Sequence, residues 1–318
     1  MKIKVIIVTL LTLFLIGCSV DNIKQYIPML TKTDDTLQKL DSGKAVVQLQ
    51  EELISLGYPI EATGEYDENT VWAVTDLQLE EDAIYVNGIY NDSVQYIIEQ
   101  GLAKKFIVQS PYYVPKPEQP DVYTAIIENP YEILSVVNKE FALPSDYQPL
   151  DLKVPNVRFP FEEDLPQKQL RKEAAEALEN LFAHAENDGL HLFAQSGFRS
   201  FERQEQIFTA FAEQDGEEAA NRYSARPGES EHQTGLVMDI TSESVNFQLT
   251  TEFGDTEEGI WVAKHAHEYG FVVRYPKGKE SITQYDYEPW HLRYVGTKAA
   301  TEMKNNNETL EEYLSVTK

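Results

Sequence analysis

Cysteine is almost absent from the 318-residue chain: Cys18 is the only one, so no disulfide can form within the chain. Cations are also scarce, since 27 Lys and Arg residues face 53 Asp and Glu residues, which gives a formal net charge of −26. A surface this acidic argues against binding to nucleic acid or electrostatic docking on anionic lipid. The one long apolar run covers residues 5–16. It is too short for a spanning helix, which needs ~20 residues.

The N-terminus reads MKIKVIIVTLLTLFLIGCSV, with Lys2 and Lys4 ahead of the apolar run and Cys18 directly after it. A basic segment followed by a short apolar one is typical of a secretory signal. The ending Leu-Ile-Gly-Cys resembles a bacterial lipobox, which implies cleavage before Cys18 and acylation of its sulfur. We therefore expect residues 1–17 to be a lipoprotein signal peptide. Acyl chains would hold the protein at the extracytoplasmic face of the cell membrane. An ordinary secretory signal or an uncleaved anchor is the alternative.

The length is sufficient for two domains, and composition divides the chain accordingly. Residues 18–40 are polar without clear periodicity, which indicates a tether. Residues 41–102 form a compact segment, and residues 103–125 carry four prolines, which favour an extended, semi-rigid linker. Residues 126–318 mix helical patterns with short strands. This order predicts an α+β domain with a small antiparallel sheet, preceded by a small three-helix domain.

Helical periodicity dominates the first compact segment. Apolar residues recur at spacings of three and four over residues 46–56, which predicts a helix capped by Ser42 and ended by Gly57. Further helices are expected over residues 69–79 and from residue 92 to just before Gly101. The stretches VVQLQEELISLGY, GEYDENTVWAVTDLQ and NGIYNDS resemble the peptidoglycan-binding domain of wall hydrolases. The likeness implies binding to wall glycan; a structural spacer that binds nothing is the alternative.

The second domain shows alternating helix and strand patterns. A long amphipathic helix with apolar positions 170–185 is expected to end at Gly189. A helix over residues 201–214 is expected to turn Ile207, Phe208 and Phe211 inward. The remaining expected elements are strands at 190–194, 236–240, 271–274 and 291–295, and a helix at 260–269 closed by Gly270.

The stretch SEHQTGLVMDI, residues 230–240, places Asp239 inside an apolar strand pattern. A buried carboxylate is costly unless it is paired or bound to a metal. His232 can converge with Asp239 if the chain turns at Gly235. Hydrolytic zinc centres use three such ligands, leave one position for water, and need a nearby carboxylate as base. An aspartate bonded only to backbone amides is the alternative.

Two further stretches carry residues suited to hydrolysis. In YEPWHLRYV, Glu288 lies three residues before His291, behind a proline that stiffens the turn. A metal ligand and a general base could share this corner; a core histidine and a surface glutamate are the alternative. In QSGFRS, Arg199 follows a predicted strand and a glycine. An arginine held there suits a substrate carboxylate or an oxyanion, unless it is a plain surface arginine.

Together, SGFRS, SEHQTGLVMDI and YEPWHLRYVG resemble the zinc D-alanyl-D-alanine carboxypeptidase family typified by the vancomycin-resistance carboxypeptidase VanY. The likeness covers nearly all of residues 126–300. It implies one zinc ion per chain and a set of residue roles. These are zinc ligation by His232, Asp239 and His291, general-base catalysis by Glu288, transition-state or substrate binding by Arg199, and contact with the substrate by Gln204 and Ser230.

The other four histidines are not expected to be ligands. His184 and His191 have no acidic partner at ligand spacing, and His265 and His267 lie two apart on an expected helix. Residues two apart on a helix face different sides.

The resemblance implies a D,D-carboxypeptidase that removes the terminal D-Ala from peptidoglycan stem peptides at the cell envelope. An L,D-carboxypeptidase on tetrapeptide stems, or a stem-peptide endopeptidase, is the nearest alternative. A non-catalytic wall-binding lipoprotein is an alternative of another class, and metal content would separate them. The expected partners are stem peptides, wall glycan through the N-terminal domain, and the membrane through the acyl anchor. Nothing in the sequence demands more than a monomer.

Overall fold

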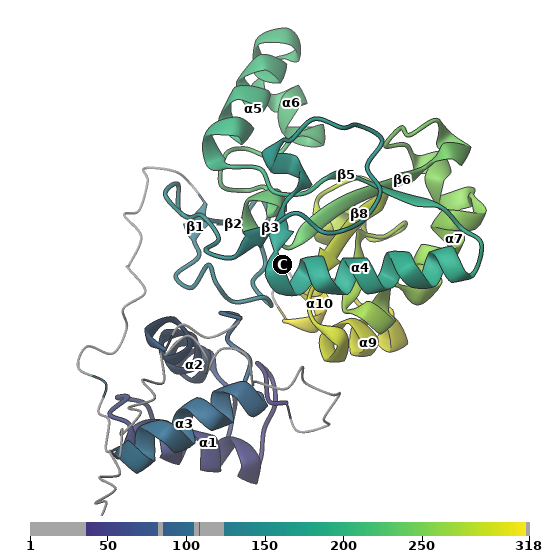
Figure 1. Cartoon of the computed structure of the whole chain (residues 1–318). Helices are drawn as coiled ribbons and strands as arrows, with labels where there is room; N and C mark the ends of the chain where they lie inside the picture. The colour runs from purple at the N-terminus through teal and green to yellow at the C-terminus, as the bar shows by residue number, and fades with distance from the viewer. Residues whose placement is uncertain (1–35, 82–84, 105–107, 109–123, 316–318) are drawn as a thin grey trace, which may run out of the picture.

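The computed structural model describes residues 36–81, 85–104, 108 and 124–315 (Figure 1). The expected signal peptide, the expected acylation site at Cys18, and most of the expected tether and linker lie outside these residues. Within the described residues, no helix is both long and apolar enough to cross a bilayer.

The N-terminal unit is a three-helix domain, as predicted. Its helices are α1 (Lys44–Ser55), α2 (Glu68–Glu80) and α3 (Asp92–Lys104). Asp67 caps α2 by accepting a hydrogen bond from the backbone N–H of Thr70. The apolar positions of the three helices form one core, which includes Val46, Leu49, Leu53, Val71, Val74, Leu77, Val94 and Ile98.

Two expected boundaries of this unit are wrong. Ser42 does not cap α1, because it forms a β-bridge with Glu65, and Gly43 takes the capping position without a side-chain bond. Helix α3 does not stop before Gly101 but continues to Lys104. A glycine inside a helix costs only about 1 kcal/mol relative to alanine, so it need not end one.

The second domain is built on a four-stranded antiparallel sheet, which confirms the predicted α+β class. The strand order is β5-β6-β8-β7, with β5 at Leu192–Ser196, β6 at Val237–Ser242, β8 at Glu288–Tyr294 and β7 at Phe271–Tyr275. Two small sheets accompany it. They pair β1 (Ala125–Ile126) with β2 (Phe141–Ala142), and β3 (Leu152–Lys153) with β4 (Leu170–Arg171).

Helices surround this sheet and close its core. The long helix α4 (Lys172–Asn187) buries its apolar stripe in the same cluster as the sheet residues Ala194, Met238 and Leu292. In Figure 1, α5 and α6 project from the domain on the side away from the N-terminal helices. The other helices are α5 (Phe201–Asp215), α6 (Glu217–Tyr223), α7 (Glu257–His265), α8 (Glu280–Thr283), α9 (Thr297–Asn306) and α10 (Leu310–Tyr313).

Several expected details of this domain differ in the structure. Phe211 is 37% exposed, because α5 projects from the domain and only Phe208 among its three expected core residues is buried. Strand β8 begins at Glu288 rather than at His291, since Tyr275 of β7 pairs with Glu288 across a register shift. The helix expected over residues 260–269 divides into α7 and a 3₁₀ turn (Ala266–Tyr269) that Gly270 closes.

Polar side chains join the three-helix unit to the second domain. Asn87 Nδ2 donates to Glu173 Oε2 at 2.8 Å, and Tyr85 donates its hydroxyl to Glu176 at 2.6 Å. Further along this boundary, Lys39 lies 3.2 Å from the buried Glu132. These contacts give the two units a defined relative placement in the folded chain.

Candidate metal centre and catalytic cavity

His232 lies on a short 3₁₀ turn, η3 (Glu231–Thr234), directly before β6. Gly235 ends this turn with a φ of 68°, in the left-handed region that favours glycine, and so directs the chain back into the sheet. The Nδ1 atom of His232 donates to the Gly197 carbonyl at 2.8 Å, which leaves Nε2 as the acceptor. Burial lowers the pKa of His232 to about 3. The imidazole is therefore neutral and ready to ligate.

Asp239 and His291 meet across the β6–β8 ladder, where they are register partners. Asp239 Oδ1 lies 3.1 Å from His291 Nδ1, and Asp239 Oδ2 lies 3.4 Å from His232 Nε2. Each of the three residues offers one ligand atom, and these atoms all lie within 4.8 Å of one another. Asp239, the unexpected acidic residue in an apolar strand, thus places its carboxylate beside two histidines.

The electrostatics of this group favour a cation at its centre. Burial opposes ionisation of Asp239, but the two histidines hold the pKa of its carboxyl below the usual range. Burial would lower the pKa of His291, yet the carboxylates beside it raise it to about 9. Asp239 Oδ1 accepts no well-aligned hydrogen bond from the described residues. Two imidazoles and one carboxylate are a typical ligand set for zinc, so the residues fit such an ion.

Glu288 opens strand β8 beside this group. Its Oε2 lies 3.5 Å from His291 Nδ1, and its side chain is 25% exposed. Burial raises the pKa of Glu288 to about 7. A carboxylate with a pKa near neutrality, next to a metal site and open to a cavity, suits a general base.

Arg199 enters the site from the segment that follows β5. Gly197 allows the close approach, because a Cβ there would lie 2.4 Å from the Gln169 carbonyl oxygen. Arg199 Nη1 donates to Gln204 Oε1 at 2.8 Å. Gln204 in turn donates to the Ala225 carbonyl at 2.6 Å, so its amide is bonded at both ends. Burial lowers the pKa of Arg199.

One cavity of about 320 Å³ unites these residues. All seven residues singled out by sequence for the site line it: His232, Asp239, His291, Glu288, Arg199, Gln204 and Ser230. Aromatic side chains of Tyr275, Tyr285 and Trp290 form part of its wall. The cavity therefore combines a candidate metal-ligand group, a carboxylate and a cation with apolar surface.

A buried ion cluster behind His291 was not expected from the sequence. It joins Glu231, Arg274, Arg293 and Glu311, whose side chains are 0–2% exposed. The sequence signal that pointed to Asp239, a charged residue inside an apolar strand pattern, was present here too. Arg274 and Arg293 lie inside the apolar strand stretches FVVRY and HLRYV.

Two of the remaining histidines have acidic neighbours, contrary to expectation. His191 Nδ1 lies 3.2 Å from Glu186, and His184 Nε2 lies 3.7 Å from Asp188. Folding creates these proximities at helix α4 and its C-terminal end. His184, His265 and Glu268 form a second group of possible ligands, but one with partly exposed side chains. The group in the cavity is buried throughout.

Comparison with known proteins places two matches along the chain. Residues 167–297 match VanY, D-alanyl-D-alanine carboxypeptidase, and residues 42–97 match a putative peptidoglycan binding domain. The chain is 53% identical over 192 residues to the putative carboxypeptidase YodJ of Bacillus subtilis, covering 60% of this chain and 70% of that protein. It is 34% identical over 150 residues to a D-alanyl-D-alanine carboxypeptidase of Enterococcus faecium, covering 47% of this chain and 45% of that enzyme.

Among the solved structures that are similar to this chain is one that it covers to 94%. It is the LdcB LD-carboxypeptidase, whose structure is described as revealing the molecular basis of peptidoglycan recognition. The superposition has a TM-score of 0.61 and 50% sequence identity, and it covers 64% of this chain and 94% of that one.

Proposed function

Since the chain belongs to the VanY family of D-alanyl-D-alanine carboxypeptidases and is an enzyme of this metallo-carboxypeptidase type, we propose that it removes a C-terminal D-alanine from peptidoglycan stem peptides with one bound zinc ion. The observation that carries the proposal is the convergence in one cavity of the buried ligand group, a carboxylate and an arginine. A peptide with a free terminal carboxylate matches this arrangement of charges.

Zinc is the ion that the ligand group fits. His232, Asp239 and His291 would hold it through two nitrogens and one carboxylate oxygen, a set typical of catalytic zinc. Bound there, zinc supplies Lewis-acid polarisation of a carbonyl and lowers the pKa of a water in the cavity.

The chain's own residues then divide the work of hydrolysis. Glu288, when ionised, takes a proton from the attacking water and returns it to the nitrogen of the departing D-alanine. A C–O bond forms while the C–N bond breaks, and the carboxylate ends the cycle as it began. Arg199 stabilises the negative charge that develops on the carbonyl oxygen, or pairs with the substrate's terminal carboxylate. Gln204 holds Arg199 in place through the 2.8 Å hydrogen bond.

Two candidate activities, L,D- and D,D-carboxypeptidase, differ in the peptide bond that is cut. The likeness to the LdcB LD-carboxypeptidase, at 50% identity over 94% of that chain, favours an L,D-carboxypeptidase that acts on tetrapeptide stems. The match to the VanY family and to the enterococcal enzyme supports the D,D-carboxypeptidase expected from the sequence, which acts on pentapeptide stems. We rank the L,D activity first because the identity is higher.

Location follows from the N-terminal sequence. We propose that Cys18 is acylated and holds the enzyme at the extracytoplasmic face of the membrane, and that the three-helix domain brings it to wall glycan. The basic residues, the apolar run and the single cysteine support the anchor, and the match over residues 42–97 supports the glycan contact. Incorporation of a clickable fatty acid, lost in Cys18→Ser, would support the anchor; an unlabelled wild-type chain would refute it.

The activity is tested with two synthetic stem peptides, one ending in Lys-D-Ala-D-Ala and one in Lys-D-Ala. The zinc-loaded chain is incubated with each, and the products are followed by mass spectrometry. Loss of a single D-alanine from the shorter peptide is the expected result, and preference for the longer one would reverse the ranking. A zinc-loaded protein that cleaves neither peptide would favour an endopeptidase or a non-catalytic wall-binding lipoprotein.

A further inference from the structure

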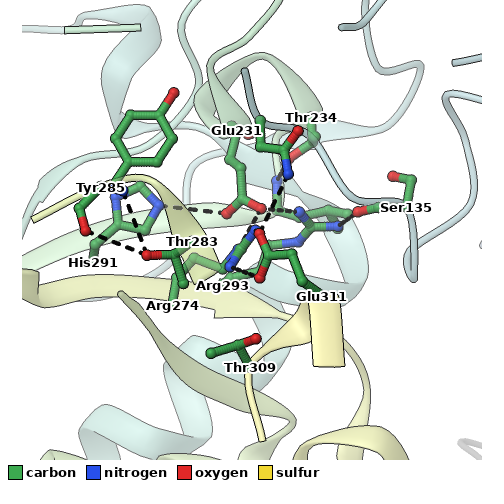
Figure 2. Close-up of polar contacts among 12 residues, drawn as sticks. Ser135, Glu231, Thr234, Arg274, Thr283, Tyr285, His291, Arg293, Thr309 and Glu311 are labelled. Atoms are coloured by element: carbon green, nitrogen blue, oxygen red, sulfur yellow. Dashed lines mark hydrogen bonds and ion pairs between the residues drawn. The ribbon is translucent and has the colours of Figure 1, made fainter. Parts of the chain in front are cut away.

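In the buried ion cluster behind the metal centre, the two carboxylate oxygens of Glu231 have different numbers of hydrogen-bond partners. Glu231 Oε1 accepts hydrogen bonds from Arg274 Nε at 2.8 Å and from Arg293 Nη1 at 2.7 Å. All three side chains are 0% exposed (Figure 2). One oxygen of Glu231 therefore serves both arginines.

The arginines are themselves fixed from other directions. Arg274 makes a two-pronged bond to Glu311, at 2.8 and 2.6 Å, and Arg293 Nη2 donates to the carbonyls of Ile133 and Ser135 at 2.9 Å each. Two carboxylates balance two guanidinium groups, so the cluster is neutral as a whole. A buried charge group with this many partners holds Glu231 in one position.

The second oxygen of Glu231 points to the metal centre. Oε2 lies 3.5 Å from His291 Nε2 (Figure 2). Asp239 lies instead at the other ring nitrogen, Nδ1. Neither Oε2 nor His291 Nε2 has a well-aligned hydrogen bond within the described residues, although both are buried. A donor and an acceptor left over in the same buried place are natural partners for each other.

The charge state of Glu231 suits this role. Its Oε1 accepts hydrogen bonds from two guanidinium groups, those of Arg274 and Arg293, and these contacts favour the ionised carboxylate. An ionised acceptor on the far nitrogen of a metal-binding histidine orients the ring and makes its other nitrogen a stronger ligand.

We propose that Glu231 is a positioning residue for the metal centre: its Oε2 accepts the Nε2–H of His291 and so presents His291 Nδ1 to the zinc ion. The inference rests on the zinc site of the proposed function. Glu231 precedes His232 in the chain, so one 3₁₀ turn provides one ligand and orients another. The arginines serve the site indirectly, by keeping Glu231 charged and in place.

Glu311 offers a matched control within the same cluster. Glu231→Gln and Glu311→Gln each remove one of the two carboxylates of the cluster, but among these two only Glu231 is paired with His291. If the cluster were only structural, the two variants would behave alike. If Glu231 positions His291, the variants differ at the metal and not in general stability.

The experiment measures zinc affinity of the full chain by competition with a chromophoric chelator, together with the visible spectrum of the cobalt-substituted protein. We expect zinc binding by Glu231→Gln to be weaker by about 10–100-fold, with an altered cobalt spectrum. Glu311→Gln should bind zinc within about threefold of wild type, with an unchanged spectrum. Thermal unfolding of the zinc-free variants should show similar losses of stability, because each leaves the arginines short of one charge.

If Glu231→Gln fails to fold, a variant that retains the negative charge still tests the inference. Glu231→Asp keeps an anion for the arginines but withdraws the carboxylate from His291, so it should fold and still lose zinc affinity. If Glu231→Asp and Glu231→Gln both bind zinc with wild-type affinity, the inference is overturned, but the proposed function is not. Equal losses in Glu231→Gln and Glu311→Gln would also overturn the inference and leave a purely structural cluster. A wild-type chain that binds no zinc would overturn the proposed function along with it.

Discussion

Asp239 on β6 and His291 on β8 face each other across neighbouring antiparallel strands, with 3.1 Å between Asp239 Oδ1 and His291 Nδ1. The strand pairing itself brings the two proposed ligands together, so the candidate metal centre is part of the sheet. His232 joins them from the turn that leads into β6. A site on paired strands needs little rearrangement to bind its ion.

The first prediction concerns the shared carboxylate. Asp239→Asn keeps the size of the side chain but removes the charge that both histidines face, so zinc affinity should fall by at least about 10-fold. Metal content after dialysis against dilute zinc measures this. Asp255→Asn, in the 3₁₀ turn Thr251–Asp255 outside the ligand group, is the control and should retain wild-type zinc. Full metal content in Asp239→Asn would remove Asp239 from the ligand set.

The second prediction concerns pH. Burial raises the pKa of Glu288 to about 7 in the metal-free protein, and His291 opposes this rise. A bound cation would lower the pKa of Glu288 from this raised value, because a nearby positive charge favours the ionised carboxylate. A base acts only when deprotonated, so kcat/KM should fall as pH decreases, with a midpoint at or below about 7. Rates measured between pH 5 and 8 test this, and a rate that rises as the pH decreases would exclude Glu288 as the base.

The third prediction separates Arg199 from the residue that holds it. Arg199→Ala removes the cation from the cavity and should lower kcat/KM by about 10²–10³-fold, the range for loss of one donor to a developing oxyanion. Gln204→Ala leaves the guanidinium in place but removes its 2.8 Å bond, so the loss should be clearly smaller. Steady-state kinetics on the preferred peptide provide the measurement. A loss in Gln204→Ala as large as that in Arg199→Ala would mean that Gln204 contacts substrate directly.

The fourth prediction concerns stability at the boundary of the two units. Burial raises the pKa of Glu132 to about 7, with Lys39 opposing the shift, whereas the unfolded chain has ~4.3. The folded state therefore binds more protons between these values, so the free energy of unfolding falls as pH rises from about 4.5 to 7. Glu132→Gln should remove this slope, which amounts to about 4 kcal/mol at most.

Urea unfolding at pH 5 and pH 8 measures that slope. Glu68→Gln serves as the control, because Glu68 also pairs with Lys39 but its side chain is 64% exposed. This variant should keep most of the wild-type pH dependence, because burial, and not the charge of Glu68, is the largest cause of the raised pKa of Glu132. A slope unchanged by Glu132→Gln would assign the pH dependence to other groups.

Local patterns were enough to predict the fold class, and together with the family resemblance they singled out the three residues that converge in the cavity. Alternation and composition identified β6 and β7, and the misplaced Asp239 pointed to the site. Boundaries were less accurate, because Gly101 sits inside α3 and Ser42 is taken into a β-bridge by tertiary contacts. Local preferences are routinely overridden in this way.

The ion cluster shows why part of the site could not be predicted. Glu231 lies on a turn, Arg274 and Arg293 lie on adjacent strands, and Glu311 lies on a C-terminal helix. Their pairing depends on the strand order, which no local pattern contains. The same holds for the contact of Asn87 with Glu173, which joins residues of separate domains.

The central claim is that Glu288 is the base of a zinc carboxypeptidase, and Glu288→Gln tests it most directly. Zinc content and release of D-alanine are measured on the same preparations of wild type and variant. The account predicts one zinc ion in each protein and a turnover that falls by about 10²–10⁴-fold in the variant. A Glu288→Gln protein that carries zinc and cleaves at the wild-type rate would contradict it.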